Sequence, residues 1–142
     1  MVQLIAGNNG KGKTRYLLDE ANKAIKEATG NIVYLDKDTA KMYDLNNRIR
    51  MINMTSYPVK NSAEFVGFVC GILSQDHDLQ YIYADNFRKV ARIDEGDKEV
   101  LSATIAELEE ISKAFNVDFI ISIALDKEEL SAELQEKVVV AL

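Results

Sequence analysis

Cysteine, histidine and proline are scarce in this chain of 142 residues, with one of each, and tryptophan is absent. A single cysteine excludes an internal disulfide and fits a reducing compartment. One histidine beside one cysteine excludes a zinc ligand set, and nothing indicates a Ser/His/Asp triad. Because no run is rich in proline, glycine or serine, the sequence predicts no linker, and we expect residues 1–142 to form a single domain.

Long apolar runs and an excess of positive charge are also missing. No stretch approaches the roughly 18 apolar residues of a membrane span, and the N-terminal apolar run is too short for a signal peptide. We therefore expect a cytoplasmic protein with no membrane partner. The formal net charge is -6, which argues against nucleic acid as a partner because an acidic chain repels phosphate backbones.

Strand-like and helix-like patterns alternate along the whole chain. Short apolar runs predict strands at residues 2–6, 31–36, 79–85, 117–125 and 137–142, and a weaker strand that begins at residue 49 and ends near Pro58. Helical spacing predicts helices at 13–28, 63–73 and 100–115, a polar helix-compatible stretch up to about residue 47, and a short acidic helix within 126–136. This order predicts an α/β fold, a three-layer α/β/α sandwich around a mainly parallel sheet. Ligands bind such sheets at the carboxyl ends of the strands.

The most specific motif follows the first predicted strand. In order, its residues are Gly7, Asn8, Asn9, Gly10, Lys11, Gly12, Lys13 and Thr14. They match the phosphate-loop pattern G-x-x-x-x-G-K-[ST], in which glycines let successive backbone N–H groups point inward at phosphate oxygens. Lys13 would contact the β- and γ-phosphates and Thr14 would contact Mg²⁺, whereas no motif position requires Lys11, which we expect to be solvated. The motif predicts binding of Mg·ATP or a close nucleoside triphosphate, and the absence of an N-K-x-D motif favours ATP over GTP.

A second carboxylate is expected to serve the same metal ion. Asp85 follows an apolar strand, and Mg²⁺ prefers hard oxygen ligands such as its carboxylate. The alternative interpretation of Asp85 is a surface turn residue. We favour the metal role because four apolar or aromatic residues lead directly into it.

With these two motifs, the chain resembles the RecA-like branch of P-loop ATPases, which includes RecA recombinases, KaiC-like ATPases and DnaB helicases. The resemblance covers most of the chain, as an ordered series of blocks at residues 7–14, 32–36, 49–53, 79–85 and 105–123. It implies that Asp36 or Asp38 orients the attacking water and that the strand within 117–125 senses the γ-phosphate. The family's residue for water activation is usually glutamate. No glutamine ends the sensing strand here, which leaves Ser122 or Asp126.

Other residues carry weaker expectations. Asn86 follows Asp85, where many P-loop ATPases place a glutamate. Cys70 lies on an apolar helical face and predicts a buried thiol, and the spacing of Gly67 and Gly71 predicts a close helix–sheet approach. The basic cluster of residues 88, 89 and 92 indicates either a solvated face or a contact with a partner or another subunit.

The sequence therefore predicts an Mg-dependent ATP-binding protein that hydrolyses ATP slowly or only with a partner. Two alternatives stay open: a non-catalytic nucleotide-binding module, and a small-molecule kinase whose arginines would cover an acceptor. A homo-oligomer is an open partner as well, because RecA-like relatives often complete their sites across a subunit interface. The chain has no counterpart of the extensions that bind DNA or shape a hexamer in the resembling family.

Overall fold

All six strands join one sheet, and every neighbouring pair runs parallel. The computed structural model describes residues 1–142. Its strands are β1 (Val2–Ala6), β2 (Asn31–Asp36), β3 (Arg50–Asn53), β4 (Leu79–Ala84), β5 (Asp118–Ile123) and β6 (Val138–Ala141), in the order β3-β2-β4-β5-β1-β6. Two strands separate β1 from β2, whereas sheets of the Rossmann type place the first two strands side by side.

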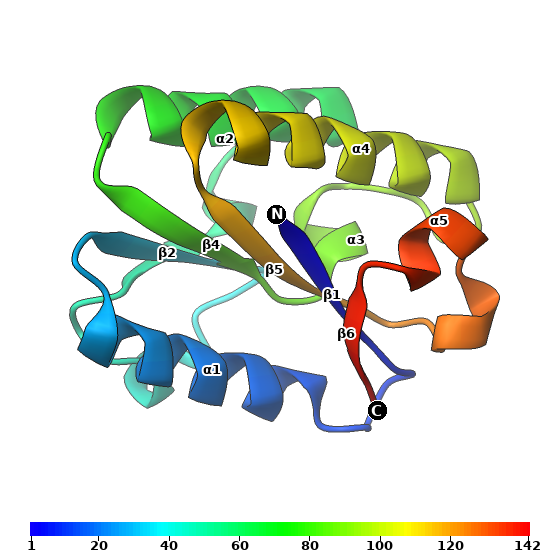
Figure 1. Ribbon diagram of the computed structural model, residues 1–142, viewed down its shortest axis with the longest axis horizontal. Coiled ribbons are helices and arrows are strands. Elements are labelled where there is room, and N and C mark those ends of the chain that lie inside the picture. Colours follow the sequence, from blue (N-terminus) through cyan, green and yellow to red (C-terminus); the bar gives the residue numbers. More distant parts are fainter.

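Helices cover both faces of the sheet, so the expected three-layer sandwich is confirmed (Figure 1). Helix α1 (Lys13–Glu27) lies on one face. The opposite face carries α2 (Ser62–Gln75), the short α3 (Phe87–Val90) and α4 (Lys98–Phe115), and α5 (Ala132–Gln135) lies beside β6. None of these helices combines the length and the apolarity that a membrane crossing requires.

The two faces bury unequal cores. The face under α2 and α4 holds a cluster of 25 buried apolar residues, and the face under α1 holds 11. On the smaller face Leu17, Leu18, Ala21 and Ile25 form one stripe of α1 that is almost fully buried against the sheet. Full burial of a leucine or isoleucine side chain contributes about 1.5–3 kcal/mol, so this stripe fixes α1, and the loop before it, to the sheet.

Most predicted elements appear within two residues of their expected bounds, but five details differ. The third strand ends at Asn53 and not near Pro58, because the 3-10 turn η2 (Met54–Ser56) follows it. Residues 37–47 form no α-helix and contain only the 3-10 turn η1 (Met42–Asp44). The four-residue α3 was not expected. Cys70 is exposed, so the prediction of a buried thiol is wrong: the buried stripe of α2 runs through Phe65, Val69 and Leu73. A methyl group built on Gly67 or Gly71 would meet no atom within 4 Å, so the predicted close helix–sheet approach is also wrong.

Candidate functional site

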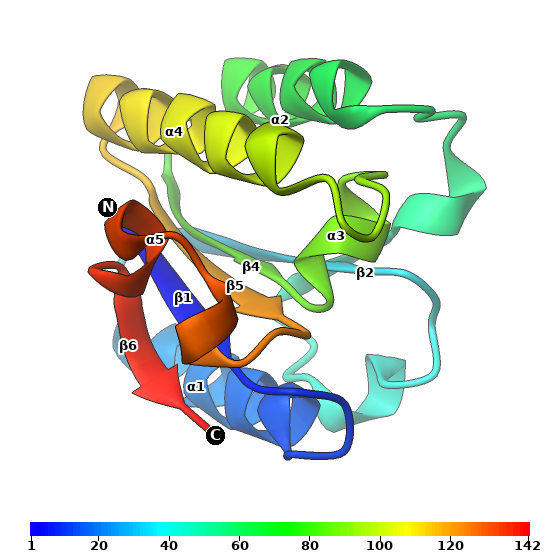
Figure 2. The ribbon, with the colours of Figure 1, turned by 90° about the vertical axis from the view of Figure 1, so that its right-hand side faces the viewer.

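The carboxyl ends of the strands bring the predicted site residues to one edge of the sheet. Figure 2 looks onto this edge, where the loop between β1 and α1 lies beside the turns that follow β4 and β5. Thr14 lies in the first turn of α1, Asp85 directly follows β4, and Ser122 lies near the end of β5. The order β4-β5-β1 makes β5 the strand between the loop and Asp85.

The loop of residues 7–14 turns back on itself through two glycines. Gly10 and Gly12 have φ values of 82° and 88°, in the left-handed region that side chains with a Cβ rarely adopt. None of the seven backbone N–H groups from Asn8 to Thr14 donates a hydrogen bond to another group of the protein. The last of these belong to the N-terminus of a 15-residue helix, whose dipole adds positive potential there. The loop therefore offers a row of free donors that suits an anion.

Lys13 lies across this loop. Its Nζ donates to the backbone oxygen of Asn8 at 2.9 Å, and the residue is only 8% exposed. Burial lowers the pKa of Lys13, and the negative charges of Asp85 and Asp126 oppose that effect. The ammonium group is thus held inside the loop by a single protein acceptor, which leaves two of its three donors for another partner.

The carboxylate of Asp85 is fixed by two hydroxyl groups. Thr14 Oγ1 donates to one carboxylate oxygen and Ser122 Oγ donates to the other, both at 2.7 Å. Ser122 is fully buried and also accepts the backbone N–H of Asn86 at 2.7 Å. Because Asp85 is only 6% exposed, this network determines where its oxygens point.

These groups surround a depression of about 340 Å³, which we call the loop depression. Its ten lining residues include predicted site residues and others: Asn9, Gly10, Gly12, Lys13, Thr14, Lys37, Asp85, Asn86, Ser122 and Ala124. A hydroxyl and a carboxylate form a hard-oxygen donor set that fits Mg²⁺, so Thr14 and Asp85 are the residues that could hold this ion. The remaining lone pairs of the Asp85 oxygens allow this beside the two hydrogen bonds.

Three residues of the predicted loop do not line this depression. Gly7 is buried at the start of the loop, and a methyl group built on it would lie 2.9 Å from the backbone oxygen of Leu142. The side chain of Asn8 turns away and donates to Asp126 at 2.7 Å. Lys11 is exposed, in line with its expected place in solvent.

The two candidate carboxylates for water activation lie in different environments. Asp36 is 3% exposed, accepts the backbone N–H of Lys37 at 2.7 Å, and does not line the loop depression. Burial, together with the nearby charge of Asp85, raises the pKa of Asp36 to about 6, although the Lys37 N–H opposes the shift. Asp38 is exposed and accepts the backbone N–H of Ala40 at 2.9 Å. Neither carboxylate lines the loop depression.

Two residues of the site were not predicted from the sequence in the place they occupy: Ser122, as the partner of Asp85, and Lys37, as a lining residue. Ser122 was considered only as a substitute for a sensing glutamine, whereas it holds Asp85 in place. Lys37 lines the loop depression through its position just after β2. A polar residue inside the strongly apolar β5, beside predicted metal ligands, was the one available signal for Ser122.

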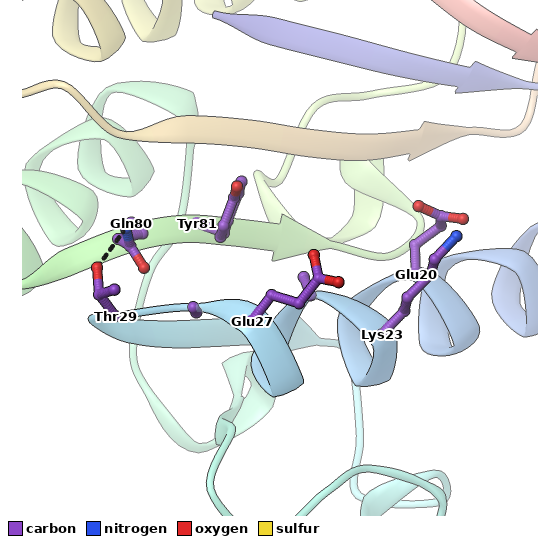
Figure 3. Close-up of a pocket in the computed structure, with 8 residues that line it drawn as sticks. Glu20, Lys23, Glu27, Thr29, Gln80 and Tyr81 are labelled. Atoms are coloured by element: carbon purple, nitrogen blue, oxygen red, sulfur yellow. Dashed lines mark hydrogen bonds between the residues drawn. The ribbon is translucent and has the colours of Figure 1, made fainter.

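A slightly larger depression, of about 390 Å³, lies away from this edge, along the C-terminal half of α1 and beside the start of β4. Figure 3 shows it between α1 and β4, with Glu20, Lys23 and Glu27 on the helix and Tyr81 on the strand. Its only amide side chain is engaged, since Gln80 donates to the Thr29 hydroxyl at 3.2 Å and accepts the Gly30 N–H at 2.8 Å. With mixed charges and no row of free backbone donors like that of residues 8–14, it is a weaker candidate than the loop depression.

No protein-family model matches this chain, and no curated protein matches it with significant similarity.

Proposed function

We propose that this protein binds Mg·ATP, or a close nucleoside triphosphate, in the loop depression. The observation that supports this best is the row of seven free backbone N–H groups from Asn8 to Thr14. Residues 8–12 of the loop are exposed, so their free N–H groups are open to an acceptor from outside the chain. A triphosphate supplies several charged acceptors at close spacing.

Each residue of the site has a separate task in this proposal. Lys13 exchanges its hydrogen bond to the Asn8 carbonyl for the β- and γ-phosphate oxygens and neutralises their charge. Thr14 and Asp85 hold Mg²⁺, which supplies charge neutralisation at the phosphates. Ser122 keeps the Asp85 carboxylate oriented while Thr14 turns its hydroxyl toward the ion.

Hydrolysis in this proposal is slow or depends on a partner. Asp85 is the only carboxylate that lines the loop depression, and it is engaged by two hydroxyl groups. Asp36 is buried and Asp38 is exposed, and neither lines the loop depression. Orientation of an attacking water by either residue requires a rearrangement, which a protein partner or a second copy of the chain would drive.

The resemblance to RecA-like P-loop ATPases is part of the same proposal. It is supported by the phosphate loop between β1 and α1, by the carboxylate after β4, and by β3, which pairs with β2 as an additional strand. The exposed thiol of Cys70 suits a reducing cytoplasm.

A non-catalytic nucleotide-binding module is the second candidate. Asn86 favours it, because its side chain is an amide at the position after Asp85 and cannot accept a proton from water. A small-molecule kinase is a third and weaker candidate, since it requires an acceptor site beside the γ-phosphate.

The test follows the label of ATP carrying a radioactive γ-phosphate, incubated with Mg²⁺ and the purified protein. We expect Lys13→Ala to abolish both nucleotide retention and any release of labelled phosphate. Lys11→Ala is the matched control, because this lysine lies in the same loop but is exposed and does not line the depression. Equal binding of ATP by the native protein and Lys13→Ala would refute the proposal. Label that stays on retained ATP would fit the non-catalytic module and equally an enzyme that needs its partner or acceptor, and repeating the assay with a partner would separate the two.

A further inference from the structure

A second depression opens at the same edge of the sheet, with a volume of about 520 Å³. We call it the basic depression, because five of its nine lining residues are cationic: Lys37, Lys60, Arg88, Lys89 and Arg92. Two carboxylates, Asp38 and Asp94, and the single apolar residue Ile93 also line it. In a chain with a formal net charge of -6, so many cations around one depression need a physical reason.

None of these five cations forms an ion pair with a carboxylate. The ion pairs of the structure involve the N-terminus, Arg15 and Lys137, all of them elsewhere. Of the two carboxylates in the lining, that of Asp38 accepts a backbone N–H from its own turn. Five cationic residues and two carboxylates leave the lining with a net positive charge, so the depression favours an anion from outside the chain.

Within the lining of the basic depression, the side chain of Arg92 is held in place by the backbone. It has a φ of 60° at the end of α3, where backbone bonds from Ile93 to Arg88 and from Arg92 to Lys89 form a helix-ending turn that usually takes glycine. Its Nε donates to the Val59 carbonyl at 3.0 Å and an Nη donates to the Met54 carbonyl at 3.4 Å. The guanidinium is therefore oriented by the backbone, and its other N–H groups are left for a ligand.

The size and chemistry of the lining select the class of ligand. The depression is open and lined almost wholly by polar residues, so a ligand there would be held by charge, and arginine with lysine is the usual donor set for phosphate oxygens. No aromatic residue lines the depression, so there is no platform on which the bases of a single-stranded nucleic acid could stack. These features fit a compact, strongly charged molecule.

We propose that the basic depression binds a small molecule that carries a phosphate monoester. Lys37 lines both this depression and the loop depression, so the bound phosphate would lie next to the nucleotide site. The proposal goes beyond nucleotide binding and does not depend on it, because the two sites share only Lys37: the loop otherwise uses backbone N–H groups and Lys13, and the basic depression uses other cationic side chains.

The experiment records backbone amide signals of the full chain, labelled with ¹⁵N, during titration with glycerol 3-phosphate. We expect saturable shifts at residues 37, 55, 60 and 88–94, with a dissociation constant in the millimolar range. Lys60→Gln and Lys89→Gln, which change two exposed side chains, should together weaken binding about tenfold, as expected for loss of charge-assisted hydrogen bonds. Lys11→Gln and titration with glycerol are the matched controls, and neither should reproduce these changes.

A separate titration with Mg·ATP follows the amide signals of residues 8–14. The two titrations therefore test nucleotide binding and phosphate-monoester binding independently. Glycerol 3-phosphate shifts confined to residues 7–14, or no saturable shift, would overturn the proposal. A single-stranded oligonucleotide that shifts residues 88–94 when glycerol 3-phosphate does not would also overturn it. Arg92→Lys is a second variant that keeps the charge but loses the two-carbonyl geometry, and it should weaken binding while amide signals elsewhere stay in place.

Discussion

The loop depression and the basic depression share one edge of the sheet and one lining residue, Lys37, but they are built in opposite ways. In the first, the donors are backbone N–H groups fixed by a turn and a helix, together with the buried Lys13, and two hydroxyl groups donate to Asp85. In the second, the donors are long cationic side chains, of which only Arg92 is tied to the backbone.

This difference predicts different responses to mutation. A backbone donor set cannot be removed by one substitution, and the groups that orient it are buried, so changes there affect binding and stability together. Exposed lysines contribute charge with little packing, so changes in the basic depression should affect binding alone, by small and salt-dependent amounts.

The largest effect is expected for Asp85→Asn. Loss of the carboxylate charge should remove the Mg²⁺-dependent gain in ATP affinity, with a fall of about 100-fold in apparent Mg²⁺ affinity. Isothermal titration with ATP at varied Mg²⁺ measures this. Asp94→Asn, in the basic depression, is the matched control and should leave the Mg²⁺ dependence unchanged. If both variants behave like the native protein, Asp85 does not hold the ion.

A smaller effect on two readouts is expected for Ser122→Ala. This change removes the hydroxyl that donates to Asp85 and accepts from the Asn86 N–H, and leaves both groups without that partner in a buried place. We expect the free energy of unfolding to fall by about 1–3 kcal/mol and Mg²⁺ affinity to fall about tenfold. Urea unfolding measures the first quantity. Lys89→Ala should change the free energy of unfolding by no more than about 0.5 kcal/mol, and a similar loss in both variants would contradict the contrast drawn between the two depressions.

The smallest effect concerns pH and Asp36. The folded protein raises the pKa of Asp36 from 3.8 to about 6, so its contribution to stability is fully present below pH 3.8 and is lost as pH rises to about 6. Asp36→Asn should therefore be more stable than the native protein by about 1–2 kcal/mol above pH 6 and equal to it near pH 4, after allowance for screening by water. Urea unfolding at several pH values tests this. Asp38→Asn, at an exposed position, is the control, and an Asp36→Asn gain that does not change with pH would be evidence against the raised pKa.

Much of the fold followed from the sequence because apolar runs and helical spacing are local signals. The strands at residues 2–6 and 31–36 were predicted with correct bounds, and the phosphate loop lies between a strand and a helix as expected. The prediction for Cys70 failed because the buried stripe of α2 passes through the adjacent Val69, about a quarter turn away. The short α3 was not predicted because it begins after Asn86, whose backbone is in the left-handed conformation, and no local sequence pattern indicates that conformation.

The candidate site could be predicted only where a single contiguous segment of the chain forms it. Residues 8–14 are contiguous, and the motif identified them without knowledge of the sheet. The contact between Ser122 and Asp85 depends on β5 lying between β1 and β4. The order of strands in a sheet cannot be predicted from local sequence patterns. The basic depression likewise brings Lys37 and Lys60 to residues 88–92, which are distant in the chain.

The unequal layers of the sandwich have a consequence for local unfolding. Helix α1 and the phosphate loop belong to the layer with 11 buried apolar residues, whereas α2 and α4 share the layer with 25. Amide hydrogen exchange therefore should be faster in α1 than in α4, because opening the thinner layer exposes less apolar surface. A ligand seated on the loop would bind only the closed form of that layer and slow its exchange, so the helix would report occupancy along its whole length.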